Sequence, residues 1–116
     1  MLAFAMEGVM EAERTNRTGK EEFKALLIEQ VDDGSVSSSL SVLRAEQLDG
    51  GEVTIRVAYS SVNYKDALAA TGTGGKIIRK YPLTGGIDAA GTVVSSTDAR
   101  FKPGDEVICT SYDFGV

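Results

Sequence analysis

Apolar and polar side chains alternate through residues 53–59, where Val53, Ile55, Val57 and Tyr59 occupy every second position. Successive side chains of an extended chain point to opposite faces, so these four side chains are expected to share one face. The pattern predicts a β-strand that is half buried. It is the clearest periodic signal in the sequence and favours a fold built from sheets.

Several further short segments indicate strands, at residues 23–29, 36–43, 87–94 and 106–110. Turn signals lie between the segments, namely DDG at 32–34, LDGG at 48–51 and KPGD at 102–105. Residues 64–71 are predicted to form a helical turn that Gly72 ends. Many short strands with one or two helical turns predict a mainly β domain, a small β-barrel.

The predicted strand at 36–43 has an uneven distribution of side chains. Val36, Leu40 and Val42 fall on one face, whereas the other face carries serines. This arrangement again indicates a strand with one apolar face.

Composition limits the class of protein. A chain of 116 residues has the size of one domain, and a hydrophobic share of 42% is enough for a core. With 17 acidic and 12 basic residues the net charge is −5, which argues against nucleic acid and anionic membranes as partners. No apolar run approaches the ~20 residues that cross a bilayer, and the first six residues make a poor signal peptide. A single cysteine fits a reducing compartment, so we expect a soluble cytoplasmic domain.

The first 22 residues differ from the rest of the chain. They carry many charged side chains and show no strand-like alternation. We therefore expect residues 1–22 to be a helical or flexible N-terminal extension and residues 23–116 to be the folded domain.

The sequence contains no histidine and one cysteine, Cys109. These counts exclude Ser-His-Asp and Cys-His nucleophilic sites within the chain, and one cysteine cannot supply the ligands of a zinc site. The DDG segment at 32–34 lacks the later ligands of a calcium loop and is expected to be a hairpin turn. Cys109 lies in an apolar strand and is expected to be a buried, inert thiol.

Two segments invite a phosphate-binding interpretation. The loop GTGGK at 72–76 fails both the P-loop pattern and the dinucleotide fingerprint, because neither the required glycines nor a Ser or Thr after the lysine is present. Lys76, Arg79 and Lys80 form a compact basic cluster, which would suit an anionic ligand but is more often a solvated loop.

The turn NYKD at 63–66 can be explained by helix formation alone. Asn63 is a preferred N-cap residue, and Asp66 would lie in the first turn, where the helix dipole stabilises a carboxylate. Tyr64 and Leu68 are four residues apart and can pack on one face.

Five segments together resemble a known family: FKAL at 23–26, NYKD at 63–66, KIIRKYPL at 76–83, GIDAAGTV at 86–93 and FKPGDEV at 101–107. They are similar to the N-terminal domain of zinc-free medium-chain dehydrogenases/reductases. The likeness is to the quinone oxidoreductase branch, in particular its acryloyl-CoA reductase (NADPH) group. Zinc-dependent members carry a cysteine near Asn63 and Gly-His-Glu at 86–88. This chain has neither, so the resemblance also implies that no metal is bound.

The resemblance implies a GroES-like, partly open β-barrel that precedes a Rossmann domain, which this chain lacks. It implies NADPH as cofactor, with Asn63 and Tyr64 in the cofactor site. Tyr64 and Asp66 are the candidate catalytic residues, Tyr64 as a proton donor or as an orienting group for a carbonyl. The implied reaction is reduction of the C=C bond of an α,β-unsaturated acyl-CoA or of a quinone or enone.

The dinucleotide fingerprint is absent from the sequence, so we expect the chain alone to be inactive. Three interpretations remain open: an N-terminal fragment of a reductase, a stand-alone non-catalytic binding module, and half of a split reductase whose Rossmann domain acts in trans. An exposed apolar strip and a homodimer are compatible with more than one of them.

Overall fold

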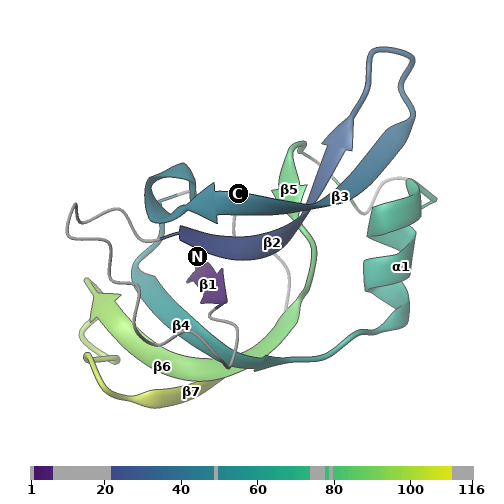
Figure 1. The fold of residues 1–116 in the computed structure, drawn as a ribbon. Coiled ribbons are helices and arrows are strands. Elements are labelled where there is room, and N and C mark those ends of the chain that lie inside the picture. The colour runs from purple at the N-terminus through teal and green to yellow at the C-terminus, as the bar shows by residue number, and fades with distance from the viewer. Residues whose placement is uncertain (1, 7–21, 49, 74–77, 79, 111–116) are drawn as a thin grey trace.

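A computed structural model describes residues 2–6, 22–48, 50–73, 78 and 80–110. The described residues form two sheets and one α-helix (Figure 1). One sheet has the strand order β1-β4-β6-β7 and the other the order β3-β2-β5, and the two do not close into a continuous barrel. The elements are β1 (Leu2–Met6), β2 (Glu22–Gln30), β3 (Val36–Arg44), the 3₁₀ helix η1 (Ala45–Gln47), β4 (Val53–Ser60), α1 (Tyr64–Thr71), β5 (Leu83–Thr84), β6 (Asp88–Ser96) and β7 (Glu106–Thr110). The expectation of a mainly β architecture with short helices and a partly open arrangement of strands is confirmed.

The main core lies on one face of the four-stranded sheet. Val53, Ile55 and Val57 of β4 are buried together with Val93 of β6 and Cys109 of β7. Full burial of an aliphatic side chain of this size stabilises the folded state by about 1.5–3 kcal/mol. The alternating pattern of β4 therefore supplies the centre of the core, as the sequence predicts.

Tyr59 does not follow that pattern. The register of β4 on β6 shifts between Val57, which opposes Gly91, and Tyr59, which opposes Ala90. One extra residue on β4 forms a bulge, and a bulge reverses which face the following side chains occupy. Tyr59 is consequently 77% exposed, and the prediction that it shares a face with Val57 is wrong.

The second sheet is dominated by the hairpin of β2 and β3. Nine residue pairs run from Glu22–Arg44 to Gln30–Val36 without a register shift. The turn at the tip contains Gly34, whose φ of +83° is a conformation that glycine adopts without strain. The predicted hairpin turn is confirmed.

The two faces of this hairpin are buried unequally. Phe23 and Leu43 are buried on one face, whereas Leu40 and Val42 on the other face of β3 are exposed. The apolar face that the sequence predicts for β3 is thus present but mostly uncovered.

Helix α1 begins and ends where the sequence predicts. Asn63 caps its N-terminus, and Gly72 follows its last residue in the left-handed conformation with a φ of +71°. A Cβ atom at Gly72 would lie 2.9 Å from Cβ of Val36. Glycine is therefore required here both by the backbone conformation and by the close approach of β3.

The N-terminal residues differ from the expectation of a helical or flexible extension. Leu2–Met6 form β1, which pairs in parallel with β4 from Leu2–Val53 to Met6–Val57. Backbone hydrogen bonding to a sheet edge does not require an alternating sequence, so this strand forms without an alternating pattern. Residues 7–21 lie outside the described residues. Among the described helices none is long and apolar enough to cross a membrane.

Candidate functional site

A small polar cluster forms where β4 leads into α1. The Asn63 side-chain nitrogen Nδ2 donates to Asp88 Oδ2 at 2.9 Å, and Ser61 Oγ donates to the same oxygen at 3.2 Å. Asp88 is the first residue of β6. We call Ser61, Asn63 and Asp88 the Asn63 cluster. It ties the turn before the helix to the neighbouring strand.

The same turn is closed by hydrogen bonds to the backbone. Asn63 Oδ1 accepts from the Lys65 N–H at 2.8 Å, and Asp66 Oδ2 accepts from the Asn63 N–H at 2.7 Å. This reciprocal arrangement is a capping box, which satisfies N–H groups at the start of a helix. The second oxygen, Asp66 Oδ1, is buried and makes no hydrogen bond within the described part of the chain. The geometry gives Asp66 a structural position, pointing at the backbone rather than outwards.

Tyr64 lies on the exposed side of this turn. Its side chain is 76% exposed, and within the described residues its hydroxyl group makes no hydrogen bond. Val62 is also exposed. The structure thus joins a fixed amide, that of Asn63, to an accessible aromatic ring on the next residue.

An apolar row lies beside the Asn63 cluster on the outer face of the four-stranded sheet. Tyr59 opposes Ala90 on β6, and Ala90 opposes Ile108 on β7, so the three side chains share one face. Ile108 is 81% exposed. Asp88 lies two residues before Ala90 and is on the same face. The exposed apolar row and the polar cluster are therefore neighbours on one surface.

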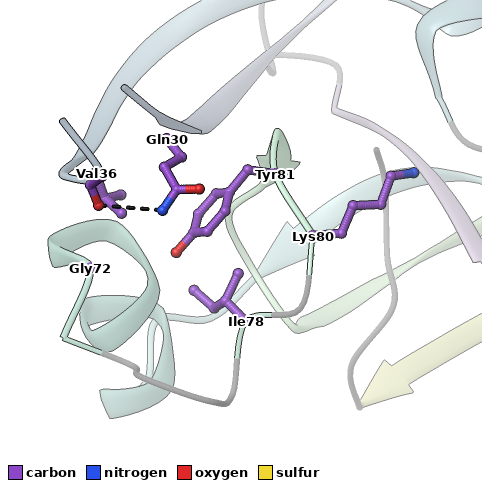
Figure 2. A pocket seen from close by; sticks show the side chains of 7 residues that line it. Gln30, Val36, Gly72, Ile78, Lys80 and Tyr81 are labelled. Atoms are coloured by element: carbon purple, nitrogen blue, oxygen red, sulfur yellow. Dashed lines mark hydrogen bonds between the residues drawn. The ribbon is translucent and has the colours of Figure 1, made fainter. Parts of the chain in front are cut away.

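The described residues also line a cavity of about 400 Å³ between the β2–β3 hairpin and the segment before β5. Figure 2 shows the Tyr81 ring between Gln30 and Ile78, with Gln30 Nε2 donating to the Gly34 carbonyl at 3.3 Å. Its full lining is Gln30, Gly34, Val36, Gly72, Ile78, Lys80 and Tyr81. Gly72 follows the C-terminus of α1, whereas Asn63 precedes its N-terminus, and eight helical residues span about 12 Å. The cavity is thus separate from the Asn63 cluster.

The basic cluster suggested by the sequence is only partly described. Lys80 is exposed and lines this cavity. Lys76 and Arg79 lie outside the described residues, so the predicted basic cluster is not tested by the structure.

Sequence reasoning assigned no role to Asp88 or Ser61. The available signal was the GID segment at 86–88, which keeps a carboxylate where zinc-dependent enzymes have the glutamate of Gly-His-Glu. The hydrogen bond to Asn63 spans 25 residues of sequence. Only the pairing of β4 with β6 brings the two side chains together.

The described residues offer neither a group of side chains that would bind a metal ion nor a reactive thiol. They contain no group of three Cys, His, Asp or Glu side chains that would hold a metal ion. Cys109 is buried, and desolvation raises the pKa of its thiol. The prediction of a buried cysteine is confirmed, and at neutral pH the raised pKa disfavours the reactive thiolate.

Comparison with known proteins decides the family. Residues 49–115 match the family described as the alcohol dehydrogenase GroES-like domain. The chain belongs to this family. This GroES-like domain is 55% identical over 94 residues to the putative quinone oxidoreductase YhfP of Bacillus subtilis, covering 81% of the chain and 28% of that protein. It is 51% identical over 92 residues to the probable acrylyl-CoA reductase AcuI of Escherichia coli, and the match covers 79% of this chain and 28% of that protein. The family and branch that the motifs indicate are confirmed.

Solved structures agree with this assignment. The B. subtilis yhfP protein with bound NAD superimposes with a TM-score of 0.73 at 52% identity, covering 83% of this chain and 29% of that one. The yhdH oxidoreductase of Salmonella enterica in complex with NADP gives a TM-score of 0.69 at 52% identity, and the match covers 76% of this chain and 26% of that one. The chain spans about 28% of the length of the curated relatives it matches.

Proposed function

We propose that this GroES-like domain is the substrate-side domain of an NADPH-dependent oxidoreductase. The reaction is reduction of the C=C bond of an α,β-unsaturated acyl-CoA such as acryloyl-CoA, or of a quinone or enone. The observation that carries the proposal is the turn at 63–66, where a fixed Asn63 amide adjoins the accessible Tyr64 ring. Relatives more than 50% identical are named quinone oxidoreductase and acrylyl-CoA reductase. A Rossmann domain, in cis or in trans, completes the enzyme.

The residues of the turn fit the nicotinamide end of the cofactor. Asn63 Nδ2 uses one hydrogen on Asp88, which leaves a second for a carboxamide or ribose oxygen. The exposed Tyr64 ring offers a flat apolar surface. The described residues contain no glycine-rich turn opening a helix that would hold the pyrophosphate, so that part of the binding belongs to the Rossmann domain.

The protein groups then have distinct tasks. When bound, NADPH supplies the hydride for the β-carbon of the substrate. Tyr64 either donates a proton through its hydroxyl group or orients the substrate carbonyl with it. Asp88 positions Asn63 through their hydrogen bond. Asp66, the other catalytic candidate, receives its hydrogen bond from the Asn63 backbone, which favours a role in holding the turn.

The test begins with the native polypeptide. An antibody against this domain, applied to its source cells, should detect a protein about three times as long as this chain, because the 94 matched residues of the 116 make up 28% of the length of the relative. That protein should oxidise NADPH when acryloyl-CoA is added and should be insensitive to metal chelators.

Tyr64→Phe should lower turnover. Tyr59→Phe is a matched control, because Tyr59 is equally exposed, at 77% against 76%, but lies on the sheet. Equal activity of both variants would refute the role of Tyr64.

An interaction module is the second candidate. The exposed Tyr59 and Ile108 favour a covering partner, since a contiguous apolar surface commonly marks an interface. A native polypeptide of 116 residues without NADPH oxidation would support this candidate, or half of a split reductase, over the single-chain enzyme.

A further inference from the structure

The cavity at the C-terminal end of α1 takes no part in the reaction centre proposed at Asn63. Its walls combine an amide and a phenol, from Gln30 and Tyr81, with the short aliphatic side chains of Val36 and Ile78. Of the described residues that line it, Lys80 alone is charged. A volume of about 400 Å³ lies within the range of sites that hold small organic molecules. The lining is thus suited to an uncharged ligand.

The polar side chains of the lining keep hydrogen-bonding capacity for a ligand. Gln30 Nε2 donates one hydrogen to the Gly34 carbonyl at 3.3 Å, which leaves its second hydrogen and the amide oxygen. The Tyr81 hydroxyl group makes no hydrogen bond within the described residues, and Figure 2 shows it pointing past Ile78 towards Gly72. A phenol can both donate and accept. Amide and hydroxyl groups separated by short alkyl segments would match this arrangement.

The cavity and the Asn63 cluster lie at opposite ends of two chain segments. Helix α1 runs from Asn63 to Gly72, which lines the cavity, and its eight residues span about 12 Å. The segment from Tyr81 to Asp88 joins the same two places, because Tyr81 lines the cavity and Asp88 accepts a hydrogen bond from Asn63. A ligand that reacts beside Asn63 and extends about 12 Å along α1 therefore reaches the cavity.

We propose, on the basis of the proposed function, that this cavity holds the pantetheine arm of an acyl thioester whose C=C bond is reduced beside Tyr64. From the thioester sulfur to its terminal oxygen the arm has about twelve bonds, as many as four residues of extended backbone, which span ~13–14 Å. This length matches the separation along α1. The arm is uncharged and carries two amides, a hydroxyl group and a dimethyl carbon, so Gln30 and Tyr81 can bind its amides while Val36 and Ile78 contact its alkyl parts. The substrate is then an acyl thioester rather than a quinone.

The charges around the cavity determine which part of a CoA thioester enters it. Asp32 and Asp33 directly precede Gly34 of the lining, so phosphate groups are repelled on this side. Lys80 is exposed, and Figure 2 shows its side chain extending away from Gln30 and Tyr81. The neutral arm therefore lies inside, and the diphosphate lies outside on the Lys80 side.

An NMR titration of the 116-residue chain with S-propionyl-pantetheine tests the site. This thioester keeps the whole arm but has no C=C bond, so it neither accepts a hydride nor alkylates a thiol. We expect saturable changes in the amide signals of Gln30, Gly72 and Tyr81, with a Kd of about 1 mM or below. S-propionyl-N-acetylcysteamine, which keeps only one amide of the arm, should bind about tenfold more weakly. Amide signals of these residues that stay unchanged up to about 10 mM overturn the proposal.

Two substitutions in the lining locate the arm. Tyr81→Phe removes the hydroxyl group alone and Gln30→Ala removes the amide, and each should raise the Kd about three- to tenfold, the effect of one neutral hydrogen bond. Glu29→Ala is the matched control, because Glu29 is the equally exposed neighbour of Gln30 on β2 and its side chain points to the opposite face. It should leave the Kd unchanged. The amide spectrum of each variant checks its fold.

An unchanged Kd in both lining variants, or an equal loss in Glu29→Ala, also overturns the proposal. CoA and phosphopantetheine carrier proteins share this arm. Whichever acryloyl thioester the complete reductase uses with the higher kcat/KM identifies the source.

Kinetics of the complete reductase separate this site from the proposed function. We expect kcat/KM for acryloyl-pantetheine to exceed that for acryloyl-N-acetylcysteamine about tenfold, and Tyr81→Phe to reduce this ratio while reduction of a small enone is unchanged. A ratio near one that Tyr81→Phe does not alter, with NADPH oxidation intact, refutes the site and leaves the proposed function standing. Binding in the cavity of a protein that oxidises no NADPH refutes the proposed function and leaves the arm-binding site standing.

Discussion

Asn63 Nδ2 and Asp88 Oδ2 are joined by a 2.9 Å hydrogen bond that links the start of α1 to the start of β6. The remaining hydrogen bonds of Asn63 hold the helix terminus, because Oδ1 accepts from Lys65 and the backbone N–H donates to Asp66. Three hydrogen bonds, to Asp88, Lys65 and Asp66, thus hold Asn63 in place. Its amide plane cannot rotate without breaking the cap or the link to the sheet. A site that must orient a cofactor or substrate benefits from such rigidity.

If the proposed function is right, loss of the Asp88 carboxylate should impair the reductase that contains this domain, through Asn63. We expect Asp88→Leu to lower kcat/KM with acryloyl-CoA about tenfold, because small misplacement of a positioning group is costly. Asp88→Asn keeps an acceptor oxygen for Asn63 Nδ2 and should retain more activity. Steady-state kinetics and NADPH affinity of both variants separate this role from simple destabilisation. Equal losses in the two variants would contradict it.

Removal of the Asp66 carboxylate should destabilise the domain. Asp66→Ala deletes the acceptor of the Asn63 N–H and half of the capping box, so we expect a loss of about 1 kcal/mol in the free energy of unfolding. Urea denaturation of the 116-residue chain measures it. Lys65→Ala leaves both capping bonds in place, since Lys65 contributes its backbone N–H, and should change stability less. An unchanged stability in Asp66→Ala would leave catalysis as the better explanation for this residue.

Gly72 is expected to tolerate no side chain. Gly72→Ala places a Cβ atom 2.9 Å from Val36 and forces alanine to a φ of +71°, so it should cost about 1–2 kcal/mol. Gly50→Ala serves as the control, because a Cβ atom there would have no neighbour within 4 Å and the φ of Gly50 is not in the left-handed region. Thermal unfolding compares the two. Equal melting temperatures would show that the helix end relaxes.

The carboxyl group of Asp98, in the turn before Phe101, should titrate at unusually low pH. Arg100 donates side-chain and backbone hydrogen bonds to the Asp98 carboxylate, which lowers the pKa of Asp98 from 3.8 to about 2. A carboxyl with a lowered folded-state pKa stabilises the protein above its unfolded pKa. That contribution is lost as the pH falls from about 4 towards about 2. Carboxyl NMR titration should show this pKa, and Arg100→Gln should raise it towards the ordinary value. An unchanged pKa in the variant would contradict the assigned cause.

The local features of this protein follow from its sequence. Alternation marks β4, the glycine and proline signals mark the turns at Gly34 and Gly104, and the NYKD segment marks the helix start. Each depends on interactions within a few residues of the chain. The absence of histidine and the single cysteine likewise exclude whole classes of catalytic and zinc site within this chain before any folding is considered.

The tertiary structure decided the remainder. The bulge before Tyr59 turns its ring outwards, Asp88 reaches Asn63, and Leu40 is left exposed on a strand that only β2 pairs with among the described residues. β1 joins the sheet without an alternating pattern. All four depend on which strand pairs with which and in what register. Pairing joins residues far apart in sequence, and a single inserted residue reverses the face of every side chain after it, so local patterns cannot determine these features.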